Sequence, residues 1–553
     1  MFRVRNVVWS LVLVVTVGSS TLATPGDTVK SFPTPGCCPQ GMTYDGEHLW
    51  VVDRMSDFIY KIDPENGAPV DSIPAPGYVP RGLTWDGARL WCVDAEEKLI
   101  FAVNPVTRIV EKTIYCPVSR PNGLAWDGAC LWVADDGDNQ LHQISSEDGT
   151  TIKSFRAPTG SPNGLTFDGT YLWVSDRMKD RIYMVTPERG DVIIELHVPG
   201  PHCWGLAWDG THLWCVDYQS DRIYKLTVDD GTTFARLEEK MEQVEFIHQV
   251  RNYGPDSVVT LDAYVAIPEN RNSQEMLEPV RFEPEPTDIL TDKWGQKVAH
   301  FQFSNLGPTE FTQVKMHAAA RISQVQFYVF PEKVGTLADI PADIRKTYLV
   351  NDTKFDLDNP VIRKAVKAAI GDETNAYWIA RRIYNYVLDH VQYELARGWN
   401  VAPTVLERGT GSCSEYSFVF IAMCRAAGIP ARYVGSVVIR GDDASWDNVY
   451  HRWVEIYLPT YGWLPVDPSR GDSDWPASQA NSFGFLNDSF LITTVGGGGS
   501  EYLAWSYNAN EEFTSRGKCK VAVENFAEWA PLETPPGELS GGGESSTESR
   551  LCR

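Results

Sequence analysis

Three residues in the C-terminal half of the sequence have the types that nucleophilic acyl chemistry requires: Cys413, His451 and Asp467. A cysteine attacks a carbonyl as its thiolate, a histidine can take and return the proton, and a carboxylate can hold the imidazole ring in one tautomer. A cysteine can equally be half of a disulfide or a core residue, and a histidine can be purely structural. The elements that carry the three residues decide between these interpretations.

The segment around Cys413 predicts a helix that starts at this residue. Apolar side chains recur at helical spacing over residues 419–427, and a Gly and a Pro follow where a helix would end. Ser412 and Glu415 form an S-x-x-E capping box, which makes Cys413 the first helical residue, at the end of the helix dipole that favours a thiolate. Cys424 lies about 16 Å further along the same helix, out of disulfide range, and is predicted to be a core residue.

The other two residues fall on a predicted β-hairpin. His451 begins the strand-like run HRWVEIYL, Asp467 ends the run WLPVD, and the short turn PTYG joins them. In the even registers of such a hairpin the two residues share a face within one diagonal step. Asp467 could then orient the imidazole while His451 faces Cys413.

The blocks GSCSEYSFVFIAMCRAAGIPARYVG, HRWVEIYL and GWLPVDPS, in this order, resemble the three motif blocks of the transglutaminase-like superfamily of papain-like cysteine enzymes. The resemblance covers about residues 340–500. It implies that Cys413 is the nucleophile, His451 the general base and then acid, and Asp467 the orienting carboxylate. It also implies that the backbone N–H of Cys413 forms part of an oxyanion hole, with Trp399 as a candidate for the second donor.

The reaction implied by this resemblance is attack of the thiolate on an amide carbonyl, giving a thioester that water or an amine resolves. Since the family includes transamidases, peptidases and deglycosylating amidases, the resemblance does not choose the acceptor. Calcium dependence, seen in animal transglutaminases, is not carried over, because the sequence has no dedicated acidic calcium loop. We therefore expect no metal and no cofactor.

An internal repeat of 41 residues fills the first 230 positions. Each unit contains four strand-like runs with an Asp-Gly turn between the first two, which is the size of a propeller blade. The fifth unit lacks its fourth strand, and the segment TVKSFPTPG ahead of the first unit supplies one. The region resembles propeller-forming repeats of the NHL and glutamine-cyclotransferase type, and a five-bladed β-propeller is predicted over residues 24–231. The units start at Gly41, Gly82, Gly123, Gly164 and Gly205.

An Asp follows the second strand of every unit, and a Trp lies within that strand. These residues are Asp53, Asp94, Asp135, Asp176 and Asp217, and Trp50, Trp91, Trp132, Trp173 and Trp214. A ring of carboxylates could bind a cation or a basic ligand, but the favoured interpretation is that each Asp caps its own turn and each Trp packs between blades. Residues that vary on this face would set the choice of ligand. One disulfide is predicted between Cys37 or Cys38 and Cys203, which precede the first strands of neighbouring blades.

Alternating runs beyond the repeat predict a small β-sandwich over residues 232–335. The transglutaminase-like catalytic core is assigned to 336–500, further strands to 501–533, and a disordered tail to 534–553, which has no apolar pattern. The predicted fold class is therefore multidomain: a five-bladed all-β propeller, then a β-sandwich, then an α+β papain-like transglutaminase core.

Residues 1–23 have the order of a secretory signal peptide: two arginines, an apolar run and then small residues. An uncleaved anchor is the alternative, although the apolar run is shorter than the ~20 residues that span a bilayer. No other segment is apolar enough to cross a membrane. Eleven cysteines leave at least one thiol unpaired within the chain, even where export permits disulfides. The net charge of −24 argues against nucleic acid as a partner.

Taken together, the sequence predicts an exported cysteine enzyme of the transglutaminase-like type, with the propeller binding a protein or polymer. It would cleave or transfer amide acyl groups of a protein or peptide substrate. The alternative is a binding or scaffold protein whose core is catalytically silent and whose propeller carries the function.

Overall fold

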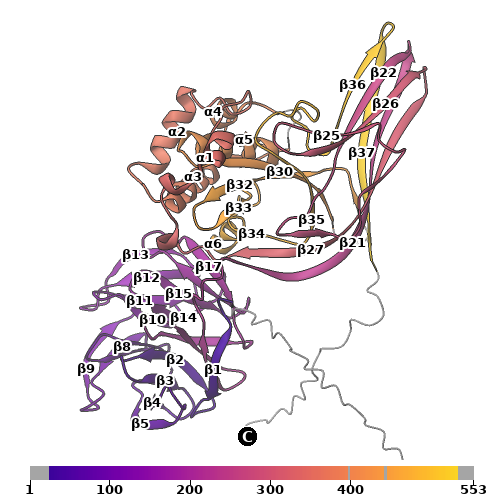
Figure 1. The fold of residues 1–553 in the computed structure, drawn as a ribbon. Helices are drawn as coiled ribbons and strands as arrows, with labels where there is room; N and C mark the ends of the chain where they lie inside the picture. Colours follow the sequence, from indigo (N-terminus) through magenta and orange to yellow (C-terminus); the bar gives the residue numbers. More distant parts are fainter. Residues whose placement is uncertain (1–23, 396–398, 441–444, 533–553) are drawn as a thin grey trace, which may run out of the picture.

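The computed structural model describes residues 24–395, 399–440 and 445–532 (Figure 1). The predicted signal peptide at 1–23 and the predicted disordered tail at 534–553 lie outside the described residues. Strands dominate the part of the chain that is described, so the mostly β architecture is confirmed. Within the described ranges, none of the helices is long and apolar enough to span a lipid bilayer.

The 41-residue repeat folds into five small antiparallel sheets of four strands each, which resemble propeller blades (Figure 1, indigo to purple). The first sheet has β2 (Pro39–Tyr44), β3 (Leu49–Asp53), β4 (Phe58–Ile62) and β5 (Pro69–Pro74); the second has β6 (Pro80–Trp85), β7 (Leu90–Asp94), β8 (Leu99–Val103) and β9 (Val110–Tyr115). The third has β10 (Pro121–Trp126), β11 (Leu131–Asp135), β12 (Gln140–Ile144) and β13 (Thr151–Arg156); the fourth has β14 (Pro162–Phe167), β15 (Leu172–Asp176), β16 (Arg181–Val185) and β17 (Val192–His197). The fifth has β18 (Cys203–Trp208), β19 (Leu213–Asp217), β20 (Arg222–Leu226) and β1 (Thr28–Pro33).

The sheets follow one another in a ring through their first strands. A side chain on Gly41 would clash with the carbonyl of Arg81 in the next sheet, and one on Gly205 would lie 2.3 Å from the carbonyl of Gln40 in the first sheet. Glycine is needed here because the backbones of neighbouring sheets approach so closely. As the repeat pattern predicts, β1 pairs with β20 and completes the fifth sheet. We call the five sheets the blade ring.

The repeated Asp and Trp residues stabilise this scaffold, as the favoured interpretation of the sequence predicted. Asp53 accepts backbone N–H bonds from Met55 and Ser56 in its own turn and, at 2.6 Å, from Cys38 in the loop before the first strand. The same arrangement recurs in the other four sheets. Each repeated Trp is buried, and its indole N–H donates to the Asp of the Asp-Gly turn five residues earlier.

The predicted disulfide between the first and fifth sheets is wrong. Cys38 and Cys203 are both unbridged thiols. The thiol of Cys203 is buried near Cys215 of its own sheet, while the thiol of Cys38 lies near Tyr218. The sequence places both cysteines ahead of their first strands but does not fix the directions in which their side chains point.

Two larger sheets with one shared core follow the blade ring. One contains β21 (Phe234–Pro255), β23 (Gln274–Met276), β24 (Arg281–Glu283), β27 (Phe311–Phe327), β31 (Trp446–Asp447), β34 (Phe485–Leu486) and β37 (Cys519–Pro531); the other contains β22 (Val258–Ala266), β25 (Asp288–Thr291), β26 (Lys297–Leu306) and β36 (Ala509–Ser515). The last two strands within the described residues, β36 and β37, thus pair with β22 and β21, more than 200 residues earlier in the sequence. Figure 1 shows these long strands extending away from the rest of the molecule.

The α+β part contains a four-stranded sheet in the order β33-β32-β30-β35, with helices against it. Its strands are β30 (Ala431–Val438), β32 (His451–Leu458), β33 (Gly462–Val466) and β35 (Phe490–Gly496), and a short pair is formed by β28 (Gln392–Tyr393) and β29 (Thr410–Gly411). The helices are α1 (Ala342–Tyr348), α2 (Pro360–Ile370), α3 (Ala376–His390), α4 (Ala402–Arg408), α5 (Cys413–Ala426) and α6 (Pro476–Ala480), with 3-10 turns η1 (Pro331–Lys333) and η2 (Leu337–Asp339).

Helix α5 is the centre of this part. The sequence pattern indicates one apolar stripe, whereas every residue from Cys413 to Arg425 is buried, because α2, α3 and α4 pack around the helix and β30 and β32 lie beneath it. Cys424 is fully buried, as predicted. A helix enclosed on all sides is held in one position, and its first residue is held with it.

Candidate active site

The start of α5 is fixed by a network around Glu415. Its carboxylate accepts the backbone N–H of Ser412 at 3.1 Å, which is the predicted return bond of the capping box, and it also accepts from Asn400 and Arg408. Cys413 is the first residue of the helix, with 8% of its surface exposed. The sulfur therefore lies at the positive end of the helix dipole on a buried and rigid element.

The predicted hairpin brings His451 and Asp467 together. The register of β32 and β33 pairs Val454 with Val466, so one further step places Asp467 opposite Trp453, two residues from His451 on the same face. The Nε2 atom of His451 lies 2.5 Å from Oδ2 of Asp467. The imidazole also stacks on the ring of Phe490, with 5.5 Å between ring centroids, which limits its rotation.

Asp467 is itself held in place. Its other oxygen, Oδ1, accepts the hydroxyl of Ser469 at 2.8 Å and the backbone N–H of Arg470 at 3.1 Å. Burial by itself would raise the pKa of Asp467, but the charge of His451 and these hydrogen bonds lower it below the ordinary value. The carboxylate is therefore ionised and has one oxygen free to bind the imidazole.

Cys413 contacts the same imidazole. The thiol lies close enough to His451 for the imidazole to lower its pKa, and since Nε2 is occupied by Asp467, Nδ1 is the nitrogen left for the sulfur. The backbone N–H of Arg452 acts in the same direction on the pKa of the thiol. The structure therefore brings together all three residues that the sequence singled out.

The electrostatics of this contact favour a charged pair. Burial would raise the pKa of Cys413, but the hydrogen bond and the positive charge of His451 lower it below its ordinary value. Burial would lower the pKa of His451, but the charge of Asp467 and the hydrogen bonds to Asp467 and Cys413 raise it to about 10. Thiolate and imidazolium are thus favoured together near neutral pH, as a cysteine nucleophile requires.

Sequence reasoning missed Arg452. Its side chain is fully buried on the opposite face of β32 from His451, and its guanidinium lies 4.3 Å from the ring centroid of Tyr507 and 4.8 Å from that of Trp399. Tyr507 comes from the chain beyond β35, outside the range predicted for the catalytic core. Trp399, the sequence candidate for an oxyanion donor, packs in this aromatic cage around Arg452. The signal that could have indicated this buried arginine is a charged residue next to His451 within the strand run HRWVEIYL.

A cleft of about 400 Å³ opens at His451. Arg440 and Arg470 line it, together with Tyr393 and Phe490. The guanidinium of Arg470 lies over the ring of Phe490, and Arg440 pairs with Asp447 at 3.1 Å. The cleft thus combines an aromatic wall with two cations beside the imidazole.

Within the described ranges, the carboxylates and imidazole close enough to share a metal ion are those of Asp135, Asp138 and His142, in the third sheet of the blade ring. Asp135 already accepts backbone N–H bonds from Ser119, Arg120 and Gly137. This group lies apart from Cys413 and is explained by the turn that Asp135 stabilises.

Comparison with known proteins identifies a family for the part that carries these residues. Residues 363–468 match the model of the transglutaminase-like superfamily. The uncharacterized protein YebA of Bacillus subtilis is 28% identical over 155 residues, which are 26% of this chain and 20% of YebA. The human peptide-N(4)-(N-acetyl-beta-glucosaminyl)asparagine amidase is 28% identical over 116 residues, 21% of this chain and 16% of the amidase. The chain thus spans a fifth or less of these curated relatives.

Solved structures show more distant similarities. One from Cytophaga hutchinsonii, provisionally assigned as a cysteine protease, covers 54% of this chain and 93% of its own with 15% identity and a TM-score of 0.40. The glutaminyl cyclase of Myxococcus xanthus covers 37% of this chain and 96% of its own, with 16% identity and a TM-score of 0.34. The match of residues 363–468 to the family model supports the resemblance that the three sequence blocks indicated. The similarities to solved structures are too distant to support it further. Residues 363–468 form a transglutaminase-like domain, and Cys413, His451 and Asp467 all lie within it.

Proposed function

We propose that the protein is an exported cysteine enzyme that cleaves or transfers amide acyl groups of a protein or peptide substrate through a thioester on Cys413. The observation that carries the proposal is the chain of contacts from the Cys413 thiol through His451 to Asp467, on a rigid helix and a rigid hairpin. The family match and the similarity to an enzyme named as an asparagine amidase support an amide as the bond attacked.

In the proposed reaction, the thiolate of Cys413 attacks the amide carbonyl and His451 donates its proton to the departing amine. The backbone N–H of Cys413, at the start of α5, is placed to stabilise the oxyanion. Water or a primary amine then attacks the thioester, His451 takes a proton from the incoming group, and the C–S bond breaks to return Cys413 as its thiolate. Asp467 keeps the imidazole in the tautomer and orientation that both steps need.

The remaining parts of the chain would present the substrate. We propose that the blade ring is a closed five-bladed propeller that binds a protein or polymer, and that the two larger sheets form a β-sandwich that supports the transglutaminase-like domain. The ring contacts between first strands and the shared core of the larger sheets support these assignments. Export follows from the signal-peptide pattern of residues 1–23.

The experiment is mass spectrometry of glutamine-rich and asparagine-rich proteins incubated with the enzyme and a primary amine. The wild type should produce amine incorporation, deamidation or backbone cleavage, and each product names one acceptor and bond. Cys413→Ala should produce none of them, whereas Cys130→Ser, which removes a partly exposed thiol in the blade ring, should match the wild type. Equal products from wild type and Cys413→Ala, or none from either, would contradict the proposal and leave the scaffold function.

A further inference from the structure

One position of the 41-residue repeat holds four different residue types in the five sheets, although the glycine that follows it is the same in all five. It is the second residue of the innermost strand in each sheet, directly before the invariant glycine. The five residues are Gln40, Arg81, Asn122, Asn163 and Trp204. We call this set the ring mouth. Because the backbone around it is the same in all five sheets, its differences are not required by the fold.

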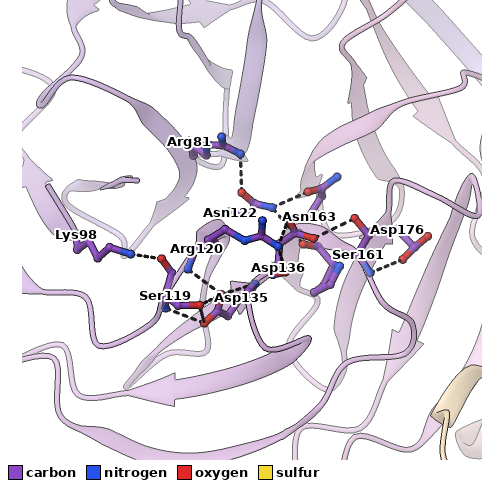
Figure 2. A network of polar contacts seen from close by, with 12 residues as sticks. Arg81, Lys98, Ser119, Arg120, Asn122, Asp135, Asp136, Ser161, Asn163 and Asp176 are labelled. Atoms are coloured by element: carbon purple, nitrogen blue, oxygen red, sulfur yellow. Dashed lines mark hydrogen bonds and ion pairs between the residues drawn. The ribbon is translucent and has the colours of Figure 1, made fainter. Parts of the chain in front are cut away.

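Three of the ring-mouth side chains bond to one another across sheet boundaries (Figure 2). Arg81 donates to the side-chain oxygen of Asn122 at 2.7 Å, and Asn122 donates to that of Asn163 at 2.7 Å. The guanidinium of Arg81 also lies 5.4 Å from the ring centroid of Trp204. Four residues from four different sheets thus meet at one place.

Arginines gather around this place. Arg54, Arg120 and Arg177, from three different sheets, are close enough that their charges, after burial, help to lower the pKa of Arg81. Asp136 acts in the opposite direction and pairs with Arg120 at 3.5 Å. A group of four arginines stands out in a chain with a net charge of −24.

Buried nitrogen atoms at the ring mouth have no acceptor within the described part of the chain. They are Nε of Arg81, Nδ2 of Asn163 and Nε1 of Trp204. Asn163 is only 1% exposed, so its amide nitrogen cannot simply be solvated at the surface. All three atoms are obligate donors, and leaving such donors buried without a partner is costly. A missing acceptor, carried by a ligand, would explain them together.

We propose that the ring mouth binds the carboxylate of an acidic peptide segment. Arginine and amide donors in a fixed arrangement match the two oxygens of a carboxylate. A dianionic phosphate fits less well, because Asp136 lies among the arginines and repels the second charge more strongly. The rings of Trp204 and Tyr218, 6.1 Å apart, offer an apolar wall for the rest of the segment.

The ring mouth lies close to the segment that directly follows the transglutaminase-like domain, and we infer that it helps to select the substrate of the proposed function, on which this inference rests. The backbone carbonyl of Pro158 accepts from Ala477, and the guanidinium of Arg156 lies 3.9 Å from the ring centroid of Trp475. Ser161, three residues after Pro158, donates to Asp136. A peptide whose carboxylate is bound at the ring mouth would therefore extend past the segment that connects Asp467 to α6.

The test is fluorescence anisotropy of labelled peptides with full-length Cys413→Ala protein, which measures binding without turnover. Peptides rich in Glu should bind, and the same peptides with Gln in place of Glu should bind at least about 10-fold more weakly. Arg81→Gln should weaken binding of the Glu peptides about 10- to 100-fold, the range for loss of charge-assisted hydrogen bonds. Arg108→Gln, which removes an exposed arginine on the outer side of the blade ring, should have no effect.

A second variant guards against a folding defect in Arg81→Gln. Trp204→Phe keeps an aromatic ring and removes one donor, so binding should weaken about 3- to 10-fold while the melting temperature is retained. Glu and Gln peptides that bind equally would overturn the proposal, as would inorganic phosphate that competes at lower concentration than a free dicarboxylate. A different measurement tests the proposed function: the Cys413 thiol of the wild type should be alkylated faster than the other thiols of the protein. Equal alkylation rates would contradict the proposed function without bearing on peptide binding.

Discussion

The blade ring and the transglutaminase-like domain use the same residue type in opposite ways. In the blade ring, a buried Asp at one repeated position accepts backbone N–H groups in all five sheets, as Asp53 does. In the transglutaminase-like domain, the single Asp467 uses one oxygen for local bonds and keeps the other for an imidazole. Repetition therefore marks residues that build the scaffold. Function is to be sought where the repeat is broken, as at the ring mouth, or where no repeat exists.

The largest effect expected from this difference is at Cys413. Cys413→Ala should lower amide turnover on the order of 10⁶-fold, as when a nucleophile that acts as one unit with its base is removed. The variant should fold normally, because the side chain is small and lies at the end of α5. Turnover and a urea denaturation curve measure the two quantities. Cys519→Ser removes another thiol and should keep the wild-type turnover. An equal loss of turnover in Cys519→Ser would contradict the assignment of Cys413 as the nucleophile.

The next effect is at Asp467. Asp467→Asn removes the charge that raises the pKa of His451 to about 10, so the pKa of His451 should fall and that of Cys413 should rise. Turnover near pH 7 should fall about 10²- to 10⁴-fold. In the wild type, alkylation of Cys413 should already be rapid below the ordinary pKa of a thiol, and in the variant the rise should move to higher pH. An unchanged pH profile would show that Asp467 acts as a structural residue, like the blade-ring carboxylates.

The repeated Asp residues should affect stability alone. Asp94→Ala leaves the backbone N–H groups of Val79, Glu96 and Glu97 without their acceptor, which should lower the free energy of unfolding by about 1–3 kcal/mol. Alkylation of Cys413 should keep its wild-type rate in the folded protein. Asp71→Ala, at an exposed ion pair with Arg108, is the matched control and should cost less than about 1 kcal/mol. A change in the alkylation rate would contradict the separation of the two roles.

The smallest effect is expected where the two regions meet. Arg156→Gln removes the cation over Trp475, worth about 0.5–1 kcal/mol at a partly exposed site. A double-mutant cycle with Trp475→Leu should return a coupling free energy of this size in urea denaturation. A coupling near zero would mean that the regions are joined by other contacts, such as the bond of 3.0 Å between Asn385 and Asp191.

What the sequence predicted was local. The capping box at Ser412, the helix start at Cys413 and the hairpin of His451 and Asp467 each lie within a few dozen residues, and each has a period or a turn as a signal. Distant pairings have no such signal: nothing in the sequence near 519–531 indicates that β37 pairs with β21, or that Tyr507 would reach Arg452. The disulfide prediction was wrong for the same reason, since it depended on the orientation of side chains in separate sheets.

The closure of the blade ring has a consequence for how the protein is made. The strand that completes the fifth sheet is β1, and Ser31 of β1 receives a hydrogen bond from Arg222 of β20, 191 residues later. During synthesis β1 must wait, unpaired, until β20 emerges, and contacts between such distant segments slow folding. Until the two strands pair, each is open to pairing with another chain. Synthesis of β20 therefore has to precede completion of the fifth sheet, so a chain interrupted before β20 would keep β1 without its partner.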